Sequence, residues 1–338
     1  MRKLFLHIGM HKTGSSSIQQ TLAALPQNGN VIYASFANFD NHSLPFIGMF
    51  AETPEKHHIF RRQGNSRSEI KAEAIEHKAS LIEQFNRYKT ENFIISGEGI
   101  IYLSESELLD VYAFLKSYFD EIIVCAYIRA PISFMESAFQ QRLKNGKASF
   151  NIIGPDYKNK FAKFEKVFGA ESVQYWAFNQ RELKNGCVVE DFCSKINFKF
   201  SPQFIKQKNI GLSLDAIKIL YYLKKNDIEI SRISRGILKD KQLVRLLSSI
   251  KGSKLRFGNE LSEKLIRENS QDIAWMQKRL ESSLNEDNES NGGGINYEKD
   301  LLNVNFKSSY KFSLAVVQFL VKSLGTSLVL FVKKIRLY

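Results

Sequence analysis

The sequence has little cysteine: only Cys125, Cys187 and Cys193 among 338 residues. An odd count excludes a complete set of intrachain disulfides, and the spacing of the last two fits no usual zinc-ligand pattern. Cys125 lies inside an apolar run over residues 122–128, so we expect it to be a small core residue. We therefore expect reduced thiols and a cytosolic protein.

We see no internal repeat in the sequence, and we expect no secretory leader. Residues 3–8 predict a buried strand that leads into a turn, whereas the apolar region of a leader would be longer and end in small residues. Acidic residues are fewer than basic ones: the sequence has 35 Asp and Glu against 48 Lys and Arg, which gives a net charge of +13. This balance favours acidic partners such as nucleotides, polyanionic glycans, nucleic acid or anionic lipid, without choosing among them.

Short apolar runs alternate with helical patterns through the first part of the chain. The expected strands cover residues 4–8, 31–34, 93–96, 121–128 and 172–178. The expected helices cover residues 15–25, 69–88, 106–119 and 188–196, and another begins at Pro131. We expect residues 38–68 to be irregular. The alternation predicts βαβ units, with ligands at the carboxyl ends of the strands, after Ile8, Ser96 and Ile128.

The second half of the sequence is predicted to be helical, over residues 213–225, 239–250 and 261–284. A polar, Gly-rich stretch follows. We therefore expect one domain over residues 1–285, a linker over 286–296 and a hydrophobic and basic tail over 297–338. The complete prediction is an α/β fold with a P-loop-type, mostly parallel sheet flanked by helices, a helical C-terminal half and a C-terminal amphipathic or hydrophobic helix.

The tail has a long apolar segment, residues 312–332, that is about the ~20 residues needed to span a bilayer. Polar residues interrupt it, and Gln318, Lys322 and Arg336 fall near one stripe of a helix. Such a helix lies in the membrane interface more readily than it crosses it. We expect residues 312–336 to bind an anionic membrane surface, and a packing or oligomerisation helix is the alternative.

The segment His7–Ser17, HIGMHKTGSSS, joins the first expected strand to the first expected helix. Gly9 and Gly14 allow tight turns, Lys12 supplies a mobile cation, and the serines supply hydroxyls, one of which can also cap the helix. Such an arrangement directs backbone N–H groups and a helix N-terminus at an anion. We predict that the anion is bound by Lys12, Thr13, Gly14, Ser15, Ser16 and Ser17.

This loop differs from the nucleotide-triphosphatase loop G-x-x-x-x-G-K-[ST]. Gly9 and Gly14 have its spacing and Ser16 holds the hydroxyl position, but Ser15 stands where the lysine belongs and the lysine is at position 12. The sequence also lacks an apolar strand that ends in Asp and could hold magnesium. Both departures disfavour hydrolysis of ATP or GTP.

A second pattern lies in residues 122–141, where an apolar strand ends in Arg129 and Ser137 follows eight residues later. Together, the two patterns resemble the donor-binding motifs of sulfotransferases that use 3′-phosphoadenosine 5′-phosphosulfate (PAPS), especially bacterial carbohydrate-type members. The resemblance implies that the loop holds the 5′ phosphosulfate and that Arg129 and Ser137 bind the 3′ phosphate, for which arginine is well suited. It covers roughly residues 1–285. The G-x-x-G-x-x-K loop of many animal members is missing, and Lys251, Lys254 and Arg256 could replace it.

Transfer to a hydroxyl group needs a base and a cation near the leaving group. Lys12 is the expected cation, and Glu98, in Ser96-Gly97-Glu98-Gly99, is the expected base because it follows a strand end between glycines. A carboxylate that pairs with Lys12 or caps a helix is the alternative for Glu98. His11 is the second candidate for the base. A basic cluster with His57 and His58 could bind an acidic acceptor or be a solvated loop.

The resemblance implies a PAPS-dependent sulfotransferase that acts on a hydroxyl of a glycan or glycolipid and releases 3′,5′-ADP. It implies no metal requirement, and we expect no nucleic acid partner. We expect a cytoplasmic protein that is peripheral on, or anchored to, the inner face of the membrane. A P-loop kinase for a small molecule and a non-enzymatic, membrane-associated nucleotide-binding protein are the alternatives.

Overall fold

The computed structural model describes residues 1–26, 29–206, 211–228, 240–280, 284, 294–304, 309–310, 312–314 and 316. The chain forms two compact units. The first comprises Met1–Ala130, Asp156–Lys208 and Ser270–Asn285, and the second comprises Pro131–Pro155, Asn209–Asn269 and Glu286–Tyr338. Most of the predicted linker and of the predicted membrane-binding segment, residues 312–336, lies outside the described residues, so the domain limits and the role of the tail stay predictions.

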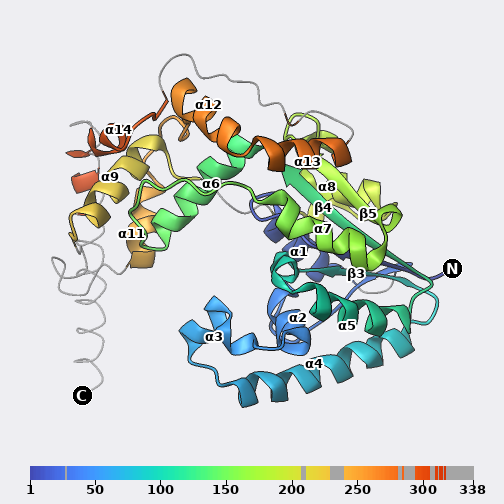
Figure 1. Ribbon diagram of the computed structural model, residues 1–338. Helices are drawn as coiled ribbons and strands as arrows, with labels where there is room; N and C mark the ends of the chain where they lie inside the picture. Colours follow the sequence, from blue (N-terminus) through green and yellow to red (C-terminus); the bar gives the residue numbers. More distant parts are fainter. Residues whose placement is uncertain are drawn as a thin grey trace, which may run out of the picture. The chain divides into compact units, whose positions relative to one another are not determined.

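A five-stranded parallel sheet forms the centre of the first unit, in the order β2-β3-β1-β4-β5. Figure 1 labels β3, β4 and β5 of this sheet. The strands are β1 (Lys3–His7), β2 (Val31–Tyr33), β3 (Asn92–Ser96), β4 (Glu121–Arg129) and β5 (Val173–Phe178). His7, the last residue of β1, pairs in register with Ser96 of β3 and with Cys125 of β4. The predicted α/β class with a parallel sheet is confirmed, and the loops after β1 and β3 begin at the same edge.

Helices cover both faces of this sheet. On one face, α1 (Ser15–Ala23) and α8 (Val188–Lys195) pack on Phe5, Cys125 and Tyr127 in a shared apolar cluster. On the other face, α5 (Glu105–Lys116) and α7 (Tyr157–Phe168) contact β4. Leu4 and Leu6 of β1 are fully buried, and burial of such a side chain contributes about 1.5–3 kcal/mol. The central strand is therefore a rigid support for the loop that follows it.

Most of the remaining elements of the first unit lie between β2 and β5 in the sequence, and the others follow β5. They are α2 (Ser43–Phe50), α3 (His58–Gln63), α4 (Arg67–Arg87), α13 (Ser270–Leu280) and the short 3-10 helices η1 (Pro54–Lys56), η2 (Glu98–Tyr102), η3 (Ala170–Ser172), η4 (Lys184–Gly186) and η5 (Pro202–Phe204). The three cysteines are buried and free, as expected.

Three local predictions differ from the structure. The segment 38–68, expected to be irregular, contains α2 and α3, because buried Phe46, Ile47 and Phe60 give these short helices an apolar side. Helix α7 was not predicted. The expected helix over 261–284 is interrupted at Asn269, where α12 (Asn259–Glu268) ends and α13 follows. The interruption arises because α12 packs in the second unit and α13 in the first.

The second unit is helical, as predicted, with α6 (Pro131–Lys144), α9 (Leu214–Lys225), α11 (Asp240–Leu247), α12 and α14 (Glu298–Leu302) among its described residues. Helix α6 carries Glu136, which is 4% exposed and accepts hydrogen bonds from Arg256 Nη1 and the Phe257 N–H, both at 2.8 Å. This pairing satisfies a buried carboxylate. Among the described residues, no helix has the length and apolar character needed to cross a membrane.

Candidate active site

The loop between β1 and α1 contains several left-handed backbone positions. Gly9 and Gly14 have φ values of 103° and 80°, and Lys12 adopts φ 71° although it carries a side chain. Inside the loop, the fully buried Thr13 donates from Oγ1 to the Met10 carbonyl at 2.6 Å. This bond fixes the turn from within and leaves the Lys12 side chain exposed.

Helix α1 starts with Gly14 as its N-cap and has no side-chain cap, so the expected serine cap is wrong. The N–H of Ser17 donates to the Gly14 carbonyl at 2.9 Å, whereas the N–H groups of Gly14, Ser15 and Ser16 have no hydrogen-bond partner among the described residues. These donors lie at the positive end of the helix dipole. Such a helix start suits an anion, and binding of an anion by this loop stays a prediction.

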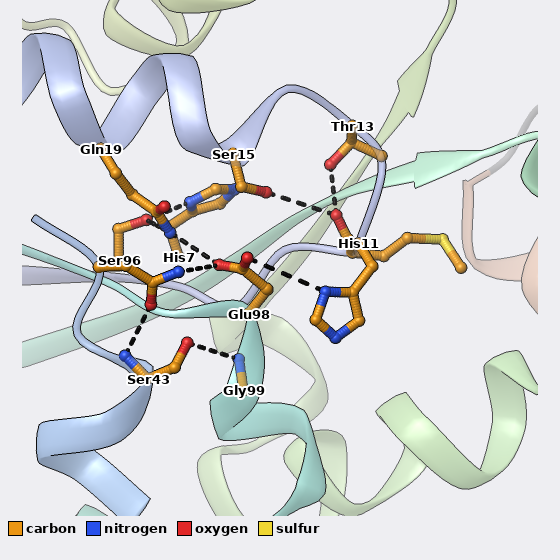
Figure 2. A network of polar contacts seen from close by, with 11 residues as sticks. His7, His11, Thr13, Ser15, Gln19, Ser43, Ser96, Glu98 and Gly99 are labelled. Atoms are coloured by element: carbon orange, nitrogen blue, oxygen red, sulfur yellow. Dashed lines mark hydrogen bonds and ion pairs between the residues drawn. The ribbon is translucent and has the colours of Figure 1, made fainter. Parts of the chain in front are cut away.

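Glu98 is the first residue of η2, directly after β3 and Gly97. Its Oε2 accepts two amide hydrogen bonds, from Gln19 Nε2 at 2.8 Å and from Asn41 Nδ2 at 2.9 Å (Figure 2). Its side chain keeps 17% of its surface exposed. No hydrogen bond from Lys12 to Glu98 is seen, and Glu98 caps no helix by a side-chain bond. The carboxylate is therefore held by neutral donors.

The loop and Glu98 fit closely against each other. A Cβ atom at Gly9 would lie 2.9 Å from the Glu98 Cβ, and one at Gly97 would lie 2.7 Å from the Ser43 backbone nitrogen. Because atoms cannot approach so closely without a shift, both positions require glycine in this arrangement. Gly9 thus lets the loop after β1 approach Glu98, and Gly97 lets the end of β3 approach the start of α2.

Two buried histidines lie beneath this part of the site. His7 Nδ1 is 2.7 Å from Ser96 Oγ, and His42 Nδ1 accepts the Ser96 backbone N–H at 3.1 Å. Burial lowers the pKa of His7 to about 4 and that of His42 to about 3, so both imidazoles are neutral near pH 7. Their Nε2 atoms have no hydrogen-bond partner within the described part of the chain. The end of β3 therefore packs on two polar but uncharged side chains, His7 and His42.

His11 lies beside Glu98 rather than beneath it. Its Nδ1 is 3.9 Å from Glu98 Oε1, which is longer than a hydrogen bond (Figure 2). Its ring centroid is 5.7 Å from that of Tyr102. Desolvation lowers the pKa of His11, the Glu98 carboxylate opposes this shift, and Lys160 and Lys12 add to it. His11 is thus close to the expected base without being bonded to it.

Arg129, the last residue of β4, reaches the loop from the other side of β1. Its Nη1 donates to the Lys12 carbonyl at 2.7 Å, and its own carbonyl accepts from Tyr157 Oη at 2.5 Å. Ser137 lies on α6 in the second unit and is partly buried. The structure therefore joins Arg129 to the predicted loop, and the pairing of Arg129 with Ser137 stays a prediction.

Sequence reasoning missed three residues near these groups: Gln19, Asn41 and Lys160. Gln19 and Asn41 bind Glu98, and no motif marks them. Lys160 belongs to α7, between Tyr157, which contacts the Arg129 carbonyl, and Lys163, whose Nζ donates to the carbonyls of Ile101 and Leu103. The apolar spacing of Phe161, Phe164 and Phe168 could have revealed this helix, and with it the lysine. In the described part of the chain, no three His, Cys, Asp or Glu side chains are grouped to hold a metal ion.

Comparisons with known proteins add a distant structural similarity. No protein-family model matches the sequence, and no curated protein matches it. Among solved structures, the chain is similar to a sulfotransferase from Alicyclobacillus acidocaldarius, with a TM-score of 0.35 and 12% identity, over 68% of this chain and 95% of that one. A similarity this distant assigns neither residues nor activity, so function is argued below from this chain's own residues.

Proposed function

We propose that this protein transfers a sulfuryl group from PAPS to a hydroxyl group of a glycan or glycolipid. The observation that carries the proposal is the meeting of three predicted groups at one edge of the sheet. The loop with Lys12 follows β1, Glu98 follows β3, and Arg129 ends β4, and these three strands are neighbours. Two of these groups, the Lys12 loop and Arg129, belong to the sequence motifs that resemble donor-binding motifs of sulfotransferases.

On the donor side, the free N–H groups at the start of α1 and the side chain of Lys12 suit the 5′ phosphosulfate. Arg129, a planar cation, suits a phosphate group. During transfer, a bond forms between the acceptor oxygen and sulfur while the bond from sulfur to the 5′ phosphate oxygen breaks, and 3′,5′-ADP leaves. Lys12 would stabilise the negative charge that develops on this leaving oxygen.

On the acceptor side, Glu98 would take the proton that the acceptor hydroxyl releases. A general base must lie within hydrogen-bond reach of that proton, and Glu98 is adjacent to the loop through its contact with Gly9. His11 is the second candidate, 3.9 Å from the carboxylate. In this role no covalent intermediate is required, since alignment and electrostatics supply most of the catalysis.

The kinase alternative is weaker because of the position of the lysine. In a nucleotide-triphosphatase loop, the lysine stands directly after the second glycine. Here Ser15 holds that place, is 5% exposed and turns its Oγ toward the Met10 carbonyl at 3.4 Å. A lysine at position 12 instead lies before the helix start, in the exposed part of the loop.

Ligand binding tests the proposal directly. We expect 3′,5′-ADP to raise the melting temperature of the full chain more than 5′-ADP or ATP does, because only 3′,5′-ADP carries the 3′ phosphate. Incubation with PAPS and a panel of methyl glycosides and glycolipids, followed by mass spectrometry, should then reveal a sulfated product. The absence of any shift at saturating 3′,5′-ADP would sink the proposal, and a larger shift with ATP would revive the kinase.

A further inference from the structure

We propose that Gln19 and Asn41 form an amide clamp that orients Glu98 so that Oε1, and not Oε2, takes the proton from the acceptor. This inference rests on the proposed function and adds two positioning residues to it. Gln19 comes from α1, and Asn41 lies just before α2, so the clamp holds Glu98 from two separate elements.

Both hydrogen bonds of the clamp end on the same oxygen. Gln19 Nε2 and Asn41 Nδ2 lie 2.8 and 2.9 Å from Oε2 of Glu98. No described residue donates a hydrogen bond to Oε1, and His11 Nδ1 lies 3.9 Å from it. The lone pairs of Oε2 are therefore largely occupied, while Oε1 keeps capacity for a new partner.

The direction of each amide is set by its other contacts. Asn41 Oδ1 accepts the Ser43 backbone N–H at 2.8 Å, which turns Nδ2 toward Glu98. Gln19 Nε2 also lies 3.3 Å from Ser96 Oγ, which in turn is 2.7 Å from His7 Nδ1 (Figure 2). Because a backbone N–H cannot act as an acceptor, the Asn41 orientation is not interchangeable with its flipped form.

Burial makes this arrangement rigid. Gln19 is 2% exposed and Ser96 is fully buried, so Gln19 has few other partners. Two donors from different elements resist rotation of the carboxylate about its last bond. A base held in this way keeps the acceptor oxygen in line with the sulfur, and a misplacement of about 1 Å can cost about 100-fold in rate.

The test compares Gln19→Met, which keeps length and helix propensity but removes the donor, with Gln20→Met on the same helix. Gln20 is partly exposed and has no side-chain hydrogen bond among the described residues. We expect Gln19→Met to lower kcat with PAPS and the best methyl glycoside acceptor about 10- to 100-fold. The Kd for 3′,5′-ADP should stay within about twofold, because the hydrogen bonds of the clamp go to Glu98 and Ser96 and not to residues 12–17.

A double-mutant cycle separates positioning from a structural role. In a Glu98→Gln background there is no base to position, so Gln19→Met should lower kcat further by less than about twofold. An equal loss in both backgrounds, or wild-type kcat in Gln19→Met, would overturn the clamp while leaving the proposed function intact. If Gln19→Met does not fold, Asn41→Leu is measured in the same cycle. Failure of the unaltered protein to bind 3′,5′-ADP or transfer sulfate would instead overturn the proposed function.

Discussion

The two sides of strand β1 differ in their chemistry. On the β3 side, a carboxylate is enclosed by amide groups above a layer of neutral histidines. On the β4 side, the cation Arg129 donates to the carbonyl of Lys12, whose own side chain is exposed. Under the proposed function, the carboxylate on the β3 side would serve the acceptor, and the cations would serve the donor.

This difference predicts which kinetic step each side controls. A cation near the leaving group acts on developing charge and on binding of the anionic donor. A clamped carboxylate with no cationic hydrogen-bond donor acts on the acceptor proton and contributes little to donor affinity. Substitutions on the two sides should therefore separate into effects on donor binding and effects on turnover alone.

The largest effect is expected for Lys12→Ala on the β4 side. Removal of the cation should lower kcat/KM about 100- to 1000-fold, as loss of one group that stabilises transition-state charge does in other enzymes. The measurement is sulfate transfer from PAPS, with Lys89→Ala as the control, since Lys89 is exposed near the amino end of β3. Sulfate transfer by Lys12→Ala at the rate of the unaltered protein would show that Lys12 does not stabilise the leaving group.

Glu98→Gln tests the β3 side and should lower kcat about 100-fold. The Kd for 3′,5′-ADP should change little, because the amide removes the base but preserves the shape. His11→Ala should lower kcat less than tenfold, or about 1.4 kcal/mol, since His11 is not bonded to the carboxylate. The opposite order of losses would make His11 the base and Glu98 its neighbour.

Arg129→Ala tests whether the β4 side recognises the 3′ phosphate. Loss of a charge-assisted bond should weaken binding of 3′,5′-ADP about 10- to 100-fold, in line with about 1.5–3 kcal/mol for such bonds. Calorimetry with 5′-ADP provides the control, because that ligand lacks the 3′ phosphate and should lose less. Equal losses for both ligands would mean that Arg129 acts only through its bond to the Lys12 carbonyl. Ser137→Ala, measured in the same way, tests the sequence-based pairing separately.

Much of the β4 side could be predicted from the sequence. The apolar run that ends in Arg129 and the glycine-containing loop after β1 are local patterns, and parallel strands bring their carboxyl ends to one edge. The choice of Glu98 also came from a local pattern, a strand followed by Gly97 and Gly99. Local signals sufficed to locate these groups, whose roles stay proposals, because each group lies within a few residues of a strand end.

The rest of the β3 side could not be predicted in this way. Asn41 contacts Glu98 across 57 positions of sequence, and Gln19 across 79. Asn41 is in place because α2, which was expected to be irregular chain, packs on η2 through Ser43 and Gly99. Such contacts depend on tertiary packing, which cannot be predicted from hydrophobic periodicity or from motif spacing in the sequence.

The smallest effect concerns acid stability and applies to the β3 side alone. His42 accepts the Ser96 N–H through Nδ1, so protonation of that atom would break the bond. Burial holds the pKa of His42 at about 3 when folded, against 6.5 when unfolded. As pH falls below 6.5, the unfolded chain binds the proton and the folded chain does not, so stability is lost by up to about 1.4 kcal/mol per pH unit.

His42→Asn keeps an acceptor that does not titrate, and its urea-unfolding free energy should fall less steeply with acid than that of the unaltered protein. Parallel pH profiles would show that the β3 side does not depend on a neutral His42, and the contrast between the two sides would then rest on Glu98 and its amides.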